Sequence, residues 1–117
     1  PLHRFGYIHI YNNYYNQILS SGINVRMGGI ALIESNYFEN AMNPVTSRYS
    51  DVVGYWDLRN NHIGNNITWT VESDTLANAD NWESTAIYPA NELNYSYTPD
   101  SAACVKQIVT ATAGAIL

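Results

Sequence analysis

A repeat of about 22 to 25 residues, a length typical of stacked coils, is the feature that most constrains how this chain can fold. Three segments share one order, an apolar residue, two variable residues, an asparagine and an aromatic ring: Ile10–Tyr15, Ile33–Phe38 and Leu58–Ile63. The asparagines that recur with this period are Asn13, Asn36 and Asn61. Arginine forms a second landmark of nearly the same period, at Arg4, Arg26 and Arg48. Two landmarks with nearly one period predict a coil of stacked units.

Two kinds of coil have repeats of this length. Leucine-rich repeats need a dense framework of leucines, whereas this chain contains seven, irregularly spaced. A parallel β-helix builds each turn, or rung, from short strands joined by sharp bends. The segment Tyr7–Tyr15 is rich in the β-branched and aromatic residues that strands favour. The sequence therefore predicts an all-β chain folded as a parallel β-helix, with a period of about 22 to 25 residues.

The repeated asparagines suit the sharp bends of such a coil. Asparagine tolerates the left-handed backbone conformation that a tight bend requires. Stacked side-chain amides can also donate to one neighbour and accept from the other, as in asparagine ladders. We therefore predict a structural ladder formed by Asn13, Asn36 and Asn61, with the following aromatic rings stacked beside it.

The repeat ends near Thr70, which predicts two parts of one domain: rungs over 1–70, and an extended tail with a short capping helix over 71–117. Four large aromatic residues should anchor the tail to the coil: Trp82, Tyr88, Tyr95 and Tyr97. Apolar residues at three- and four-residue spacing predict the helix from Ala102 to Leu117. Its apolar face is expected to cover the open end of the coil. Cys104 lies beside that face and is expected to be buried as a small apolar residue.

Composition excludes several classes of protein. Charged residues make up 13% of the chain, against about 25% in an average domain, while there are 15 asparagines and 10 tyrosines. Such a sequence is unlike a disordered tail or a helical bundle. Five basic residues in a chain of net charge −5 cannot form a nucleic-acid-binding patch. No apolar run is long enough to span a membrane, and one cysteine excludes an internal disulfide and a cysteine-rich zinc site.

The start of the chain resembles a known enzyme family. Pro1–Gly6 reads Pro-Leu-His-Arg-Phe-Gly, and the strand-like segment Tyr7–Tyr15 follows directly. Bacterial pectate lyases of polysaccharide lyase family 1 carry an Arg-x-Pro-x-x-Arg segment and then a strand of the form Val-His-Val-Tyr-Asn-Asn-Tyr-Tyr. Further similar segments are Gly22–Arg26, Ser35–Asn40 and Asn43–Val45. The chain is thus similar to the C-terminal portion of that family, whose fold is a right-handed parallel β-helix.

The resemblance implies a chemistry. Family members cleave polygalacturonate by β-elimination. Calcium bridges substrate carboxylates to acidic side chains and acidifies the proton at C5, because the developing enolate charge must be neutralised. An unprotonated arginine removes that proton, and the leaving group departs from C4.

The resemblance also implies which of these residues the chain carries. Pro1 matches the proline of the motif, so the arginine base would lie two residues before Pro1. The calcium ligands of the family would lie further upstream. The chain then supplies no catalytic residue and no metal ligand. It retains the second arginine of the motif, Arg4, whose guanidinium would bind a galacturonate carboxylate of the substrate.

Four other residues are candidates for the site, but a structural role is the favoured interpretation for each. His3 reads as a bystander in a turn. His9 alternates with Ile8 and Ile10 and should face away from both as a structural residue. Arg26 and Arg48 could extend a groove for an acidic polymer, but ion pairs with Glu34, Glu39 or Asp51 are the favoured expectation.

The predicted function is therefore part of a secreted, calcium-dependent pectate lyase. Its expected partners are polygalacturonate and the missing N-terminal part of the same protein. One alternative is a pectin lyase of the same fold, which acts on methylated polymer without calcium. The other is a non-catalytic β-helix module that binds polysaccharide or has a structural role. The arginine-containing segment Pro1–Gly6 argues against the second.

Overall fold

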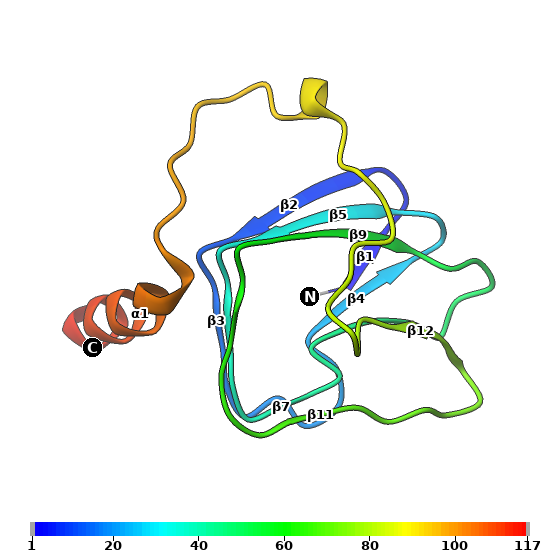
Figure 1. The fold of residues 1–117 in the computed structure, drawn as a ribbon, viewed down its shortest axis with the longest axis horizontal. Helices are drawn as coiled ribbons and strands as arrows, with labels where there is room; N and C mark the ends of the chain where they lie inside the picture. The colour runs from blue at the N-terminus through cyan, green and yellow to red at the C-terminus, as the bar shows by residue number, and fades with distance from the viewer. Residues whose placement is uncertain (1, 117) are drawn as a thin grey trace.

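The chain winds into three stacked rungs of a coil (Figure 1). The computed structural model describes residues 2–116, with the side chains of residues 2–111. The first rung contains β1 (Leu2–Arg4), β2 (Tyr7–Tyr11) and β3 (Tyr14–Tyr15). The second contains β4 (Ile23–Arg26), β5 (Ile30–Glu34), β6 (Tyr37–Phe38) and β7 (Ala41–Met42). The third contains β8 (Val45–Arg48), β9 (Tyr55–Arg59), β10 (His62–Ile63) and β11 (Ile67–Thr68).

Two sequence predictions extend beyond these described residues. The first is the match of Pro1 to the proline of the family motif, because Pro1 lies outside the described residues. The other concerns the end of the predicted helix, because the side chains of residues 112–117 are outside the described part.

Corresponding strands of successive rungs pair in parallel, which confirms the predicted mainly parallel β architecture. Within the sheets, the strands of the rungs follow the orders β1-β4-β8, β2-β5-β9, β3-β6-β10 and β7-β11. Register explains the sequence period. Leu2 pairs with Asn24 one rung later, and Tyr37 pairs with His62 in the same way. Each rung thus returns the chain to the same position one strand spacing further along the coil.

Inward-facing side chains fill the coil. Successive residues of a strand point to opposite faces, so each strand contributes every second residue to the interior. The core contains Ile10, Ile23, Val25, Ala31, Ile33, Phe38, Val45 and Trp56, each at most 7% exposed. Burial of these apolar side chains is the main force that holds the rungs together.

The bend after each strand of the β2-β5-β9 sheet uses the left-handed conformation, but not at the predicted residue. Positive φ angles occur at Asn12 (58°), Ser35 (55°) and Asn60 (54°). Each of these residues precedes a ladder asparagine. The expectation that the ladder asparagines themselves adopt this conformation is therefore wrong. The preceding residue makes the bend, which leaves the asparagine side chain directed along the coil.

The asparagine ladder itself is confirmed. Asn13 Nδ2 donates to Asn36 Oδ1 at 3.1 Å, and the pattern continues from Asn36 to Asn61. The predicted stacking of the next ring holds between Tyr37 and His62, whereas Tyr14 meets Tyr37 edge-on. Tyr37 lies between Tyr14 and His62, at centroid distances of 5.7 and 4.4 Å.

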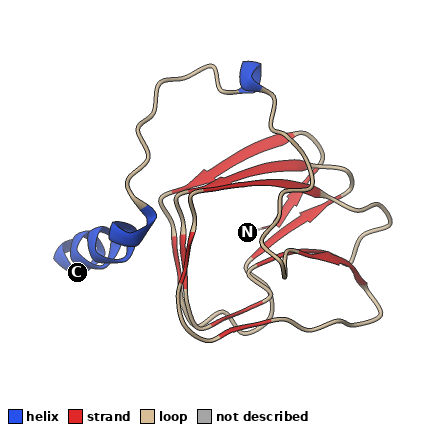
Figure 2. Ribbon diagram, viewed as in Figure 1, coloured by secondary structure: helices blue, strands red, loops and turns tan. Residues whose placement is uncertain are grey.

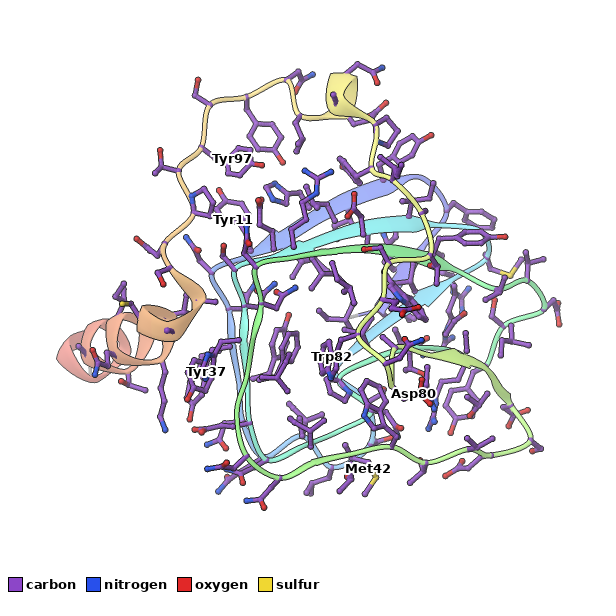
Figure 3. The ribbon with its side chains drawn as sticks, viewed as in Figure 1. Tyr11, Tyr37, Met42, Asp80, Trp82 and Tyr97 are labelled. Atoms are coloured by element: carbon purple, nitrogen blue, oxygen red, sulfur yellow. The ribbon has the colours of Figure 1, made fainter. Side chains whose placement is uncertain are left out.

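The end of the coil is closed by the tail. Strand β12 (Thr75–Asn78) pairs antiparallel with β8, so the segment predicted to be irregular contains one strand. Thr85 N then donates to the carbonyl of Trp56 in β9 at 2.8 Å. Trp82 points into the coil interior (Figure 3), with ring centroids 5.6 Å from Phe38 and 5.5 Å from Trp69. These residues cover backbone edges and core side chains of the last rung.

Helix α1 (Ala102–Ile116) lies beside the coil (Figure 2), and it contacts β3 and β6. The predicted helix is confirmed, but its expected position over the open end is wrong, because the tail already occupies that end. Among the side chains of α1 that the structure describes, Ala102 and Val105 are buried. Cys104 is exposed, which corrects the expectation that it is buried. Neither α1 nor the short 3-10 helix η1 (Ala90–Glu92) is long and apolar enough to cross a membrane over the described residues.

The tail crosses the outer face of the β2-β5-β9 sheet before it reaches α1. Tyr88 is buried there, with its ring edge-on to Tyr7. Tyr97 lies over Tyr11 in Figure 3, at a centroid distance of 5.4 Å. The hydroxyl of Tyr95 forms a hydrogen bond of 2.6 Å with His9 Nδ1. Together with Trp82, these tyrosines confirm the four predicted anchors.

Candidate functional site

The repeated arginines lie at the same end of three stacked strands but differ in burial. Arg4 ends β1 and pairs in register with Arg26 at the end of β4. Arg48 ends β8, one rung further. Arg4 is exposed, Arg26 is half-buried, and Arg48 is 2% exposed. Arginines at equivalent positions of the repeat therefore differ in their exposure to solvent and to a ligand.

A hollow of about 460 Å³ opens beside the first two arginines. Each rung contributes to it through the turn that follows the arginine position. These turns have positive φ angles at Phe5 (57°), Met27 (52°) and Tyr49 (57°), so they are sharp and stack closely. The lining residues are Arg4, Phe5, Arg26, Met27, Tyr49, Ser50, Asp51, Ser73, Asp74 and Leu76.

The guanidinium of Arg4 faces this hollow without a protein partner. Among the described residues, no hydrogen bond or ion pair engages it. Arg26 has its guanidinium carbon 5.7 Å from the centroid of the Tyr49 ring, and its buried Nε has no hydrogen-bond partner in the described structure. Two cationic side chains thus line the hollow, with donors available to an anion.

The expected ion pairs of Arg26 and Arg48 are wrong. Glu34 instead lies 3.0 Å from His9 Nε2, and Glu39 lies 2.7 Å from Lys106 Nζ. Asp51 takes part in none of the ion pairs of the described residues. Sequence spacing could not identify these partners, because His9 lies on a neighbouring strand and Lys106 on the distant helix.

Arg48 has a structural environment. Its Nη2 donates to the carbonyl of Thr70 at 3.0 Å, and its backbone N–H donates to Asn24 Oδ1 at 3.1 Å. Asn24 Nδ2 returns a bond of 3.2 Å to the Arg48 carbonyl. Buried in this way, Arg48 connects β8 with the start of the tail and does not face the hollow.

Both histidine candidates of the first rung have local partners. His3 is in register with the core residue Val25, and its Nε2 lies 3.1 Å from the Gly6 carbonyl. His9 faces away from Ile8 and Ile10, as predicted, and its side chain is 3% exposed beneath the tail. Neither lines the hollow.

From the sequence, Asp51 was considered only as an ion-pair partner of an arginine, and Asp74 was assigned no role. Asp51 follows the turn of the third rung, and Asp74 precedes β12. Asp51 could have been identified as a residue of the hollow, because it lies three residues after the last repeated arginine, Arg48. No periodicity marks Asp74, because its position depends on the antiparallel pairing of β12 with β8.

The described residues do not fit a calcium site. Calcium requires six to eight oxygen ligands, usually including several carboxylates. No group of three metal-ligating side chains comes together in the described part of the chain. The hollow places its two carboxylates beside two arginines, a combination that disfavours a divalent cation.

Stacked parallel rungs and an arginine-lined hollow define a coiled parallel-β protein with a surface suited to an anionic ligand. Over residues 1–116, the sequence matches a family described as pectate lyase. The chain belongs to the pectate lyase family. It is 52% identical over 122 residues to pectate lyase 1 of Pectobacterium carotovorum, and 50% identical over the same length to pectate lyase B of Dickeya chrysanthemi.

Solved structures agree with this family. Pectate lyase II from Xanthomonas campestris pv. campestris matches 96% of the chain with a TM-score of 0.91 and 59% identity. Pectate lyase C from Erwinia chrysanthemi, solved with Ca²⁺, matches 86% with a TM-score of 0.76 and 46% identity. A pectate lyase C mutant in complex with pentagalacturonic acid matches 90%, with a TM-score of 0.74 and 42% identity.

The chain spans about a third of the length of these relatives. It covers 32% of the Pectobacterium protein and 32% of the Dickeya protein. It covers 34% of the Xanthomonas chain and 30% of the Erwinia chain that was solved with Ca²⁺. The mainly parallel β fold of the chain therefore matches part of the fold of these pectate lyases.

Proposed function

We propose that the chain is part of a pectate lyase that cleaves polygalacturonate by calcium-dependent β-elimination, on a right-handed parallel β-helix. The observation that supports this proposal most directly is the arginine-lined hollow in a chain of the pectate lyase family. Polygalacturonate carries one carboxylate on each sugar, and a guanidinium can hold a carboxylate with two parallel hydrogen bonds.

Arg4 is the proposed substrate-binding residue. It is exposed, it lines the hollow, and no partner among the described residues engages its guanidinium. The arginine base and the calcium ligands are proposed to come from the part of the protein that precedes Pro1. On this proposal the isolated chain has no lyase activity, and the complete protein is secreted, since its polymeric substrate lies outside the cell.

The pectin lyase alternative receives less support. One matched relative was solved with Ca²⁺ and another with pentagalacturonic acid, which bears free carboxylates. A hollow lined by Arg4 and Arg26 also favours a charged polymer over a fully methylated one.

An absorbance assay tests the proposed function. The complete protein, incubated with polygalacturonate and calcium at alkaline pH, should form an unsaturated product that absorbs ultraviolet light. A chelator should abolish product formation, and calcium added back should restore it. Equal rates with and without the chelator, or product only from methylated pectin, would favour the pectin lyase alternative. No product from either polymer would favour a non-catalytic module.

A further inference from the structure

The hollow beside Arg4 changes the sign of its charge along the coil. Its first two rungs contribute Arg4 and Arg26, whereas the third rung and the following segment contribute Asp51 and Asp74. With strands about 4.8 Å apart, three rungs extend over about 10 Å. A polymer lying along the hollow would therefore meet cations at one end and carboxylates at the other.

Both aspartates are held at their end by the backbone. The backbone N–H of Tyr49 donates to the carbonyl of Asp74 at 3.0 Å, and Thr75 pairs with Arg48 in the β12-β8 ladder. The turn that carries Asp51 is tied to the second rung, because the N–H of Met27 donates to Ser50 Oγ and to the Val52 carbonyl, each at 3.0 Å. These bonds fix the backbone of Asp51 and Asp74 beside the hollow.

Neither carboxylate has a direct ion-pair partner among the described residues, although both lie in the same hollow as Arg26. None of the hydrogen bonds or ion pairs of the described residues engages the side chain of Asp51 or Asp74. Their charges therefore act on whatever occupies that end of the hollow. A sugar carboxylate there would be repelled, since like charges disfavour each other over several ångströms at moderate salt.

Apolar side chains lie next to these aspartates. Leu76 is 47% exposed and the Tyr49 ring is 50% exposed, and both line the hollow. A methyl ester removes the charge of a galacturonate and adds a small apolar group. The aspartates would tolerate such a sugar, and its methyl group would cover part of the exposed apolar surface.

We propose that the third-rung end of the hollow, formed by Asp51, Asp74, Tyr49 and Leu76, selects a methyl-esterified galacturonate, while Arg4 and Arg26 take free carboxylates. The preferred substrate is then a partially esterified polymer with free and esterified sugars side by side. This inference rests on the proposed pectate lyase function, and it assigns the aspartates a role in specificity.

The test compares two substrates in the complete enzyme. For wild type and the double variant Asp51→Asn/Asp74→Asn, kcat/KM is measured on fully de-esterified polygalacturonate and on partially methyl-esterified pectin. The double variant should gain about three- to tenfold on polygalacturonate, as expected for removal of two nearby like charges, and should change little on the esterified polymer. Added salt should shrink the gain, because it screens exposed charges.

Glu72→Gln is the matched control. Glu72 is exposed on the same segment but does not line the hollow, so its removal changes net charge without changing the lining. It should leave the substrate preference as in wild type. The inference is overturned if the double variant keeps the wild-type preference, if Glu72→Gln shifts it equally, or if the double variant loses calcium-dependent cleavage of polygalacturonate. The last result would mean that the aspartates bind the cation.

A binding measurement separates this inference from the proposed function. Absence of product from the wild-type enzyme on both polymers would overturn the lyase function alone. Calorimetric titration without calcium, using trigalacturonate and its methyl ester, then decides the inference. The double variant should bind trigalacturonate more tightly than wild type does and the ester about equally. Equal affinities of both proteins for trigalacturonate would overturn it.

Discussion

Asn36 and Asn61, which occupy equivalent positions on successive rungs, are joined by a hydrogen bond of 3.2 Å from Nδ2 to Oδ1. Asn61 Oδ1 also accepts the backbone N–H of Asn36 at 3.0 Å. On the other side, Asn36 Nδ2 donates to the carbonyl of Ile10 at 3.0 Å. Asn36 is fully buried. One side chain therefore satisfies polar groups on three successive rungs.

Replacing Asn36 with alanine should destabilise the coil strongly. The substitution leaves several buried donors and acceptors without partners, each costing about 1–3 kcal/mol. We expect the free energy of unfolding to fall by at least about 3 kcal/mol in chemical denaturation. Asn16→Ala is the control, since Asn16 is exposed and accepts one bond from Asn40. Its loss should cost less than about 1 kcal/mol. Equal effects would show that the ladder does not stabilise the rungs.

The ladder could be predicted because its cause is periodic. Each rung returns to the same place, so a side chain that bonds its own copy must recur with the period of the coil. A second ladder, from Asn66 through Asn40 to Asn16, follows the same rule with bonds of 2.7 and 2.9 Å. Sequence reasoning missed it among so many asparagines. Its members lie three, four and five residues after Asn13, Asn36 and Asn61, so the alignment of the first ladder does not bring them into register.

The closure of the coil could not be predicted in this way. Strand β12 is short, Thr75–Asn78, with no strong alternation, and its pairing depends on the free edge of β8. The helix pattern showed that α1 has an apolar face but not which surface that face would contact. Tail residues occupied the end of the coil, which left the side of β3 and β6 for the helix.

Attachment of the tail should depend on pH through Asp57. Burial of this carboxyl opposes its ionisation, but hydrogen bonds from Arg59 and from the backbone N–H of Tyr88 outweigh burial and lower its pKa below the ordinary value of 3.8. A depressed folded pKa contributes stability above the ordinary pKa, and this stability is lost as pH falls through the folded value. We therefore expect the tail to loosen below about pH 3.8.

Hydrogen exchange at the amide of Tyr88 measures this loosening. The amide donates to Asp57 Oδ2 at 2.9 Å, so it should be protected at neutral pH and lose protection in acid, after correction for the intrinsic rate. Asp57→Asn should weaken protection at neutral pH and remove most of its pH dependence. Asp80→Asn, at an exposed position, should behave as wild type. An unchanged pH dependence in Asp57→Asn would assign it to another group.

Arg4 should matter for turnover and little for stability. Loss of a charge-assisted bond to a substrate carboxylate costs about 1.5–3 kcal/mol, so Arg4→Ala in the complete enzyme should lower kcat/KM on polygalacturonate by roughly one to two decades. Arg4→Lys should restore part of this loss, because an ammonium lacks the planar fork of guanidinium. Lys106→Ala, which removes a cation on α1, should leave kcat/KM unchanged. Wild-type kinetics in Arg4→Ala would make Arg4 an ordinary surface residue.

The isolated chain should associate. Strands β1, β2 and β3 are the first strands of their sheets, and their outer edges have no partner among the described residues. Three large side chains near this edge are exposed: Leu2 at 54%, Phe5 at 62% and Tyr7 at 46%. Unpaired edges recruit further strands. Sedimentation of the purified chain at micromolar concentration should reveal dimers or larger species. A monomer that unfolds cooperatively would contradict this expectation.

The most direct test of the account compares the chain with the complete protein in one assay. Both are incubated with polygalacturonate and calcium at alkaline pH, and the unsaturated product is followed by its ultraviolet absorbance. We predict product from the complete protein and none from the chain, because the proposed base and calcium ligands precede Pro1. Product formed by the isolated chain, or none formed by the complete protein, would contradict it.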